Sequence, residues 1–317
     1  MSTLVVIEVE NGRVELVSRE TLTFARAFEA PVAALVLSAT VPDGVLADCA
    51  EQGVEVVYAV SGAPGAYAPA AWATAAEAAL AASGADTVLA GGTPRGLEVL
   101  AHVAARRAVR MAANVTSVVA EGPLRVVRQV VGGAALEEME LPDALRVVAV
   151  AGHAVEAAPA AIPGAAALTS LDAPASEADQ RAVVARVQER AGGDASALAN
   201  ASVVVGAGRG AGGPDGFASV DALAARLGGV VGVSRVVTSL GWRPHHEQVG
   251  QTGSRISPDV YLPCGISGAI QHWAGCQSSK VIIAVNTDPD APMVTKATYA
   301  VIGDMHEVLP AVLTELG

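Results

Sequence analysis

The residues of this sequence with the clearest chemical potential lie in CGISGAIQHWAG, the stretch from Cys264 to Gly275. A short apolar strand leads into a turn containing Gly265, Ser267 and Gly268, and His272 follows early in the predicted helix. The first amides of a helix have no internal partner and the dipole is positive there, so this arrangement favours an anion. The histidine indicates chemistry beyond phosphate binding, with a histidine packed in the core as the alternative.

The same half of the sequence contains four further apolar strands that end in residues able to bind a ligand. In an open α/β sheet, ligands bind beyond the carboxyl ends of the strands. We therefore expect one set of side chains to converge with residues 265–272: Arg209, Ser234, Arg235, Asn286 and Asp304. The convergence of five strand ends predicts a ligand site at one edge of this sheet.

Two glycine-containing motifs lie between these strands. Gly208, Gly210 and Gly213 match GxGxxG, but the acidic residue that a nicotinamide site needs at the next strand end is replaced by Ser234 and Arg235. This replacement argues against NAD and leaves NADP as an alternative. The motif QVGQTG, residues 248–253, is either a surface turn or a ligand contact, and its spacing favours neither.

Other candidate sites in the sequence are weaker. His245 and His246 are adjacent and have no third ligand at a suitable spacing, so we predict no metal site. The loop AGGTPRG, residues 90–96, follows a strand in the first half but lacks the lysine of a phosphate-binding loop. We identify no catalytic acid, base or nucleophile.

Strand-like and helix-like segments alternate along the chain and predict an α/β fold with mainly parallel sheets flanked by helices. Asn11-Gly12 predicts a hairpin. Residues 155–180 are rich in Ala, Pro and Ser and predict an irregular segment, followed by a last strand in RAVVARVQER, residues 181–190. We therefore predict two domains, residues 1–190 and residues 191–317, the second with a Rossmann-like nucleotide-binding sheet.

One helix of the second domain shows a clear apolar stripe, which we expect to face the core. The stripe consists of Phe217, Val220, Leu223, Ala224 and Leu227. Gly228 follows it and predicts the end of the helix.

The composition excludes several classes of protein. The 317 residues carry a formal net charge of -12, which argues against a nucleic-acid groove. The three cysteines show no CxxC spacing, so neither a zinc site nor a disulfide framework is expected. The sequence lacks a signal-peptide pattern and an apolar run long enough for a membrane span, which predicts a soluble, cytoplasmic protein.

Residues from about 200 to 317 resemble the FAD domain of the electron transfer flavoprotein alpha subunit. The resemblance rests on GAGRG, VGVSR, GWRPHHEQVGQTG, YLPCGISGAIQHWAG and VIIAVNTDPDAP, and the first half resembles the family only in layout. The resemblance implies FAD as the cofactor and a first domain that packs against a beta subunit. It also implies that the protein is a carrier rather than an enzyme. Such a carrier passes single electrons from flavin dehydrogenases to a quinone-linked or other acceptor. The positions that match FAD contacts are Arg209, Ser234, Arg235, Val249, Gly250, Gln251, Thr252, Ser267, Gly268, Ala269, Ile270, Gln271, His272, Asn286 and Asp304.

The resemblance also implies roles for three of these residues. Arg235 matches an arginine close to the isoalloxazine, Thr252 a hydroxyl near flavin N5, and His272 a donor to the flavin O2 edge that stabilises an anionic semiquinone. Thr287 and Trp273 depart from the usual family residues. An NADP-linked dehydrogenase and a non-redox nucleotide-binding scaffold remain the alternatives.

Overall fold

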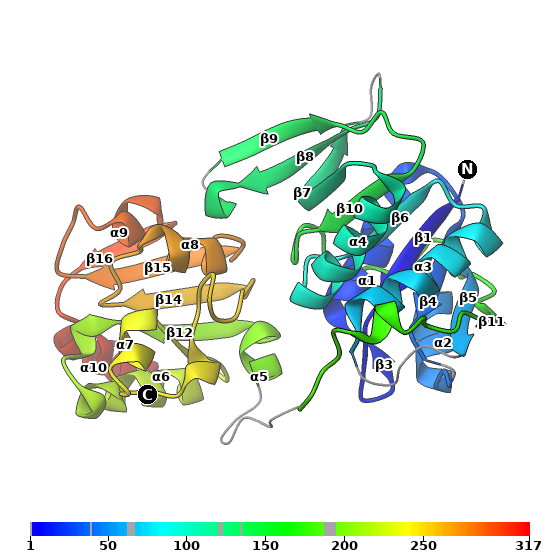
Figure 1. The fold of residues 1–317 in the computed structure, drawn as a ribbon. Coiled ribbons are helices and arrows are strands. Elements are labelled where there is room, and N and C mark those ends of the chain that lie inside the picture. The colour runs from blue at the N-terminus through cyan, green and yellow to red at the C-terminus, as the bar shows by residue number, and fades with distance from the viewer. Residues whose placement is uncertain (1, 39, 62–66, 120–122, 134, 187–194) are drawn as a thin grey trace. The chain divides into compact units, whose positions relative to one another are not determined.

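The chain forms two compact α/β units in the computed structural model (Figure 1). The structure describes all residues except 1, 39, 62–66, 120–122, 134 and 187–194. The first unit comprises Met1–Val131 and Ala135–Val187, and the second comprises Gln188–Gly317 with Gly132–Ala134. The boundary predicted near residue 190 lies outside the described residues.

The first unit is built on a nine-stranded sheet in the order β11-β5-β4-β1-β6-β10-β7-β8-β9. The strands are β1 (Thr3–Ile7), β4 (Val32–Val36), β5 (Val54–Ser61), β6 (Thr87–Gly91), β7 (Met111–Val119), β8 (Arg125–Val130), β9 (Ala135–Glu140), β10 (Arg146–Val150) and β11 (Ala167–Asp172). Neighbouring strands from β11 to β7 are parallel, and β7, β8 and β9 are antiparallel. The sheet is therefore mainly parallel, as the alternation of elements predicts.

Helices cover both faces of this sheet. α1 (Leu16–Ala25) and α2 (Asp43–Glu51) pack on one face through Leu22, Phe24 and Cys49, while α3 (Pro69–Ser83) and α4 (Pro94–Arg107) pack on the other. The shorter elements are η1 (Arg26–Phe28), η2 (Val131–Gly133) and η3 (Ala178–Gln180). Two faces with two apolar cores make this unit a three-layer sandwich.

The structure corrects several expectations for the first unit. The Asn11-Gly12 hairpin forms, but only between the two-residue strands β2 (Val9–Glu10) and β3 (Arg13–Val14). The segment predicted to be irregular contains β11, which pairs along its whole length with β5. Of the strand predicted at residues 181–190, residues 181–186 form no strand and Val183 is half exposed, while residues 187–190 lie outside the described residues.

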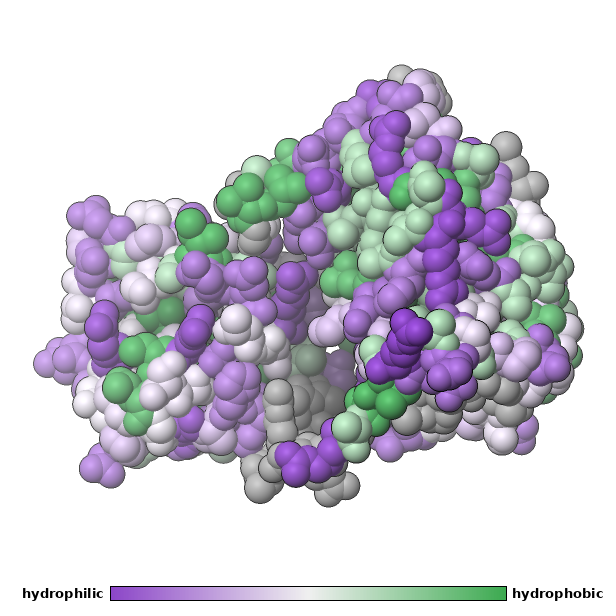
Figure 2. Space-filling view, in the orientation of Figure 1, coloured by the Kyte–Doolittle hydropathy of each residue, from purple (hydrophilic) through white to green (hydrophobic). Residues whose placement is uncertain are grey.

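Strand β9 is not predicted from the sequence, since its residues ALEEME are rich in glutamate and mostly exposed. It pairs antiparallel with β8 over six residues. Figure 2 shows an apolar area over the end of this hairpin, where Val131 and Leu136 are 73% and 68% exposed.

The second unit has a five-stranded parallel sheet in the order β13-β12-β14-β15-β16. Its strands are β12 (Val203–Ala207), β13 (Val230–Val233), β14 (Val260–Cys264), β15 (Val281–Asn286) and β16 (Tyr299–Ile302). The strand order reverses between β12 and β14, the type of position at which ligands bind in doubly wound sheets. The fold therefore places a switch point where the strand-end residues were expected to converge.

Helices also cover both faces of the second sheet. The elements α6 (Ala218–Arg226), α7 (Arg235–Ser239) and α10 (Met305–Leu316) pack on one core, and α8 (Ile270–Cys276) and α9 (Pro292–Lys296) on the other. The short elements are α5 (Ala195–Ala199), η4 (Arg209–Ala211), η5 (Pro214–Phe217) and η6 (His245–Glu247).

One residue of the predicted apolar stripe does not reach the core of this unit. Phe217, Val220, Leu223 and Ala224 are buried, but Leu227 is 38% exposed because α6 ends at Arg226 and the chain turns away at Gly228. Strand β16 is apolar, yet all four of its residues are exposed because it forms the edge of the sheet.

Candidate functional site

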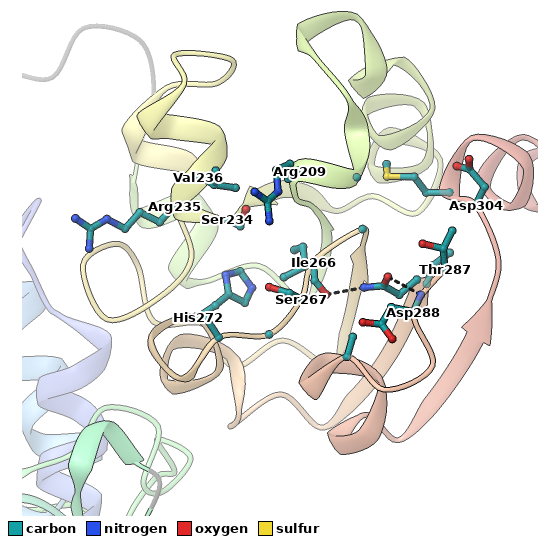
Figure 3. A pocket seen from close by; sticks show the side chains of 18 of the residues that line it. Arg209, Ser234, Arg235, Val236, Ile266, Ser267, His272, Thr287, Asp288 and Asp304 are labelled. Carbon is teal, nitrogen blue, oxygen red and sulfur yellow. Dashed lines mark hydrogen bonds between the residues drawn. The ribbon is translucent and has the colours of Figure 1, made fainter.

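A cavity of about 610 Å³ lies at the carboxyl ends of the second sheet (Figure 3). This volume falls within the range of roughly 300 to 1,000 Å³ that is typical of cofactor pockets. The predicted residues that line it are Arg209, Ser234, Arg235, Ser267, Gly268, Ala269, Gln271, His272, Asn286 and Asp304. All five strand ends therefore contribute to one cavity.

Glycines allow the loops around the cavity to pack backbone against backbone. The Gly208 amide donates to the Cys264 carbonyl and the Gly210 amide to the Gly265 carbonyl, at 3.0 and 3.1 Å. A Cβ atom added at Gly210 would lie 2.6 Å from the Gly265 Cα, closer than real side chains approach. These glycines hold the ends of β12 and β14 together.

The third glycine of GxGxxG has a different environment. A Cβ atom at Gly213 would meet no atom within 4 Å, and α6 begins only at Ala218 after two short turns. In dinucleotide-binding folds the third glycine permits close packing of helix and strand. The structure therefore lacks the local geometry that the NADP alternative requires.

Two strand-end residues differ in their orientation. Arg209 lies over the middle of the cavity, whereas the Arg235 side chain extends outward from the start of α7 (Figure 3).

Ser234 occupies the N-cap position of α7 but makes no side-chain capping hydrogen bond, and its buried Oγ has no partner among the described residues. A buried hydroxyl without a partner is costly unless a ligand or water satisfies it.

His272 is the third residue of α8 and is 7% exposed. Its Nε2 atom lies 2.7 Å from the hydroxyl of Tyr261, while its buried Nδ1 has no hydrogen-bond partner in the described part of the chain. Burial lowers the pKa of His272 to about 4, against a smaller opposite effect of the Val249 backbone. Burial also raises the pKa of Tyr261 well above its usual value. Near neutral pH the pair is therefore a neutral imidazole and a protonated phenol.

The last two strand ends are ordered by their own hydrogen bonds. The Asn286 amide donates to the Ile266 carbonyl at 3.0 Å and its oxygen accepts from the Asp288 amide at 3.1 Å. Asp304 caps α10 by accepting from the His306 amide at 2.8 Å. These bonds orient the Asn286 and Asp304 side chains at the edge of the cavity.

Cys264, the last residue of β14, is buried beside the cavity. Burial raises the pKa of its thiol to about 12, and those of Cys49 and Cys276 to about 12 as well. None of the three is therefore a nucleophile in the folded protein.

The QVGQTG motif forms a closed turn next to α8. The Gly250 amide donates to the Ser254 carbonyl at 3.0 Å, and the Gln251 amide donates to the Gln271 carbonyl at 2.8 Å. Val249 is fully buried, whereas Gln251 and Thr252 are exposed. Among the predicted contacts, this cavity is not lined by Val249, Gly250, Gln251, Thr252 or Ile270, so their contact with the cofactor remains a prediction.

Several residues of the lining were not assigned to the site from the sequence. They include Gly210, Val236, Val285, Thr287, Asp288, Ala291, Gly303 and Met305. Most are direct neighbours of predicted positions, so widening each strand end by one residue would have found them. Ala291 gave no signal, because it reaches the cavity from the start of α9.

The weaker candidates stay separate from this cavity. His245 and His246 lie in η6, and the described ranges contain no group of three or more His, Cys, Asp or Glu that could hold a metal ion. In the AGGTPRG loop the glycines serve packing, since a Cβ atom at Gly96 would lie 2.2 Å from the Gly91 carbonyl oxygen.

Comparison with known proteins assigns both units of the chain. Residues 3–178 match the family model described as the electron transfer flavoprotein domain, and residues 197–277 match the electron transfer flavoprotein FAD-binding domain. This chain belongs to the electron transfer flavoprotein family. The FAD-binding domain includes the cavity residues from Arg209 to His272, and the strand ends at Asn286 and Asp304 follow it.

Relatives within the electron transfer flavoprotein family match this chain over most of its length. Electron transfer flavoprotein subunit alpha of Mycobacterium leprae is 36% identical over 97% of this chain and 95% of its own length. The subunit alpha of Mycobacterium tuberculosis is 38% identical, covering 98% and 96%. That of Bacillus subtilis is 34% identical, covering 73% and 70%.

The cavity fits FAD, the cofactor of this electron transfer flavoprotein domain. Ser234 Oγ and His272 Nδ1 are buried polar atoms without partners in the described chain, as expected where a polar ligand completes the hydrogen bonding. Arg209 adds a cation suited to a cofactor that carries phosphates. The donor set therefore agrees with the cofactor that the family implies.

Proposed function

We propose that this chain is the FAD-carrying alpha subunit of a heterodimeric electron transfer flavoprotein. It would relay single electrons from flavin dehydrogenases to a quinone-linked or other acceptor, and would be a carrier rather than an enzyme. The observation that carries the proposal is the convergence of all five strand ends of the second unit, which contains the family's FAD-binding domain, on one cavity.

Different cavity residues would bind different parts of FAD. FAD supplies the redox chemistry when bound. Arg209 offers a cation in the middle of the cavity and Ser234 an unpaired hydroxyl. The glycine contacts between Gly210 and Gly265 let backbone, rather than side chains, form the surface nearest the ligand.

His272 and Tyr261 would set where a proton is held beside the cofactor. The Tyr261 hydroxyl is fully buried, and within the described chain His272 Nε2 is its hydrogen-bond partner. When the phenol donates to Nε2, the single proton of the neutral ring lies on Nδ1, which makes no hydrogen bond of good geometry within the described chain, although the Val249 backbone interacts with the ring. His272 would therefore act as a neutral hydrogen-bond donor, which favours negative charge on an adjacent ring.

The partners and location of the protein follow from the same proposal. A beta subunit would complete the heterodimer, with contacts mainly on residues 1–190, while residues 191–317 carry the cofactor. We expect function in the cytoplasm. In the part of the chain that the structure describes, no helix has both the length and the apolar character needed to span a bilayer.

The test is the visible absorption spectrum of the chain co-purified with its beta subunit, followed during stepwise reduction with dithionite. We expect an oxidised flavin spectrum with FAD bound, and two resolvable one-electron stages. A colourless complex that cannot be reconstituted with FAD would contradict the proposal and favour a scaffold subunit. Tight NADP binding with turnover of a small substrate would favour the dehydrogenase alternative.

A further inference from the structure

A buried glutamine links α7 to the QVGQTG turn. Gln248 is 2% exposed. The Thr238 hydroxyl donates to Gln248 Oε1 at 2.6 Å, and Gln248 Nε2 donates to Thr252 Oγ1 at 2.9 Å. Thr238 Oγ1 also lies 3.0 Å from the Arg235 carbonyl oxygen. Hydrogen bonds through Gln248 thus join Thr238, on α7, to Thr252, which is predicted to contact the cofactor.

The two distances identify which end of the Gln248 amide faces which threonine. A separation of about 2.6 Å is normal for O–H···O but short for N–H···O, whereas about 2.9 Å is normal for N–H···O. Reversing the amide would put its nitrogen 2.6 Å from Thr238 Oγ1. The amide oxygen therefore faces Thr238, and the nitrogen faces Thr252.

This orientation determines what the Thr252 hydroxyl can do. A threonine hydroxyl has one hydrogen to donate and lone pairs to accept. Because Gln248 Nε2 supplies a hydrogen to Thr252 Oγ1, the hydroxyl must direct its own hydrogen elsewhere. Thr252 is exposed, and none of its bonds within the described chain uses that hydrogen. The hydroxyl is therefore held as an outward donor.

We propose that Gln248 is a positioning residue that holds the Thr252 hydroxyl as a hydrogen-bond donor to the FAD ring. The proposal rests on the proposed function, since it needs FAD in the adjacent cavity and Thr252 at the flavin N5 edge. Gln248 itself lies outside the cavity lining and acts through Thr252. A fixed donor favours the electron-rich ring, so Gln248 raises the potential of the first reduction step.

The backbone of the turn is held independently of the Gln248 side chain. The Ser254 amide donates to the Gln248 carbonyl at 2.7 Å, and the Gln248 amide donates to the His245 carbonyl at 3.0 Å. The Gln251 amide is bonded to Gln271. A substitution at residue 248 that keeps the side-chain volume therefore removes the amide while leaving these bonds in place.

A double-mutant cycle in the complex with the beta subunit tests the proposal. The variants are Gln248→Met, Thr252→Val and the combination, and the readout is the first flavin reduction potential from spectroelectrochemical titration. We expect each single variant to lower the potential. We expect the double variant to match Thr252→Val, because both changes act on the same hydrogen bond from the Thr252 hydroxyl to the flavin. A Gln248→Met protein with bound FAD and the wild-type potential would overturn the proposal, as would fully additive shifts.

Gln52→Met is the matched control for loss of a buried amide. Gln52 is 4% exposed and accepts from the Thr23 hydroxyl at 2.9 Å, but it lies in the first unit. We expect it to lower the unfolding temperature and leave the flavin potential unchanged. A wild-type complex without FAD would instead refute the proposed function, an outcome distinct from failure of the cycle.

Gln248→Glu provides a second test if Gln248→Met fails to fold. A protonated carboxyl group at this position can still donate to Thr252, whereas an ionised one accepts the Thr252 hydrogen and draws it away from the ring. We expect the potential to fall below that of the wild type as the pH rises through the carboxyl pKa. In the double variant Gln248→Glu with Thr252→Val, only the direct electrostatic effect of the introduced carboxylate on the flavin potential remains. Equal pH dependence with and without Thr252 would therefore overturn the proposal.

Discussion

The carboxyl ends of the parallel strands are built from similar elements in the two units, but their polar side chains are paired in the first unit and partly unpaired in the second. In the first unit, the strand-end side chains are hydrogen-bonded to other side chains of the unit. Thr93, after β6, donates to Glu8, which follows β1, and accepts from the Gly96 amide at 2.9 Å. His153, after β10, is bonded through its amide and its ring to Glu20, at 2.9 and 3.1 Å.

In the second unit the corresponding edge remains incomplete. Ser234 Oγ and His272 Nδ1 are buried without partners among the described residues. The two cations of this edge, Arg209 and Arg235, make no ion pair within the described chain. Buried polar atoms in a folded protein are nearly always satisfied, so unpaired ones at a switch point mark a ligand site.

The comparison shows that the carboxyl ends of parallel strands offer a position for a ligand. Whether buried polar groups there lack partners depends on the side chains at that edge. Glu8 supplies a carboxylate at the start of α4, so the first unit satisfies this helix internally. The second unit has a cavity in the same topological position. Substitutions at the two edges therefore test the contrast between them.

The largest effect is expected from Gly268→Ala, which would overpack the cavity-lining turn against Met293. Gly268 has φ +79°, and a Cβ atom there would lie 2.5 Å from the Met293 amide nitrogen. We expect loss of bound FAD and a fall in stability of about 3 kcal/mol or more, since overpacking adds to the cost of a left-handed residue. Denaturant unfolding and flavin absorbance measure the two effects.

Gly212→Ala is the control for the left-handed backbone alone. Gly212 has φ +75° but no atom within 4 Å of an added Cβ. We expect a cost of about 1 to 2 kcal/mol and retained FAD. Equal losses in the two variants would show that the tight contact at Gly268 is unimportant.

The next effect is the pH dependence that His272 gives to the second unit. Its pKa falls from 6.5 to about 4 on folding, so the unfolded chain binds more protons between these values. Stability contributed by His272 is therefore present above about pH 6.5 and is lost as the pH falls toward about 4. The loss amounts to about 3 kcal/mol at most, at about 1.36 kcal/mol for each pKa unit.

The measurement is the unfolding free energy of the complex between about pH 7 and pH 4, for the wild type and His272→Gln. Because the glutamine does not titrate, the variant should lose less stability over this range. A parallel decline of the two proteins would exclude a neutral buried imidazole.

The smallest effects come from two residues at equivalent helix N-cap positions. Thr93 caps α4 through its side chain, whereas Ser234 precedes α7 without a side-chain cap. Thr93→Ala should cost about 1 kcal/mol of stability and leave FAD binding unchanged. Ser234→Ala should change stability little and weaken FAD binding. Thermal unfolding measures the change in stability, and FAD titration measures the change in affinity. Equal changes in the two variants would contradict the difference between the two edges.

The sequence was sufficient to predict the strand ends and their convergence, because short apolar runs and the rule for parallel sheets need only local information. Arg209, Ser234 and Asp304 were placed in this way, and the structure brings them to one cavity. The strand β11 was missed because its composition resembles a loop and its pairing with β5 joins segments far apart in the chain.

Contacts between side chains could not be predicted in the same way. Tyr261 and His272 meet because β14 and α8 pack together, and that contact, with burial, decides the protonation of the imidazole. Likewise, nothing in the spacing of Thr238, Gln248 and Thr252 indicates a shared line of hydrogen bonds. Such arrangements depend on tertiary packing rather than on periodicity.

The three buried cysteine thiols can be used to detect local opening of the cores in which they lie. Cys49 lies in one core of the first unit, and Cys264 and Cys276 lie in the two separate cores of the second. Each is 0% exposed with a pKa of about 12, so an alkylating reagent reacts only when that core opens. The order in which the three cysteines become labelled would record which core loosens first, and how far bound FAD slows the two in its own unit.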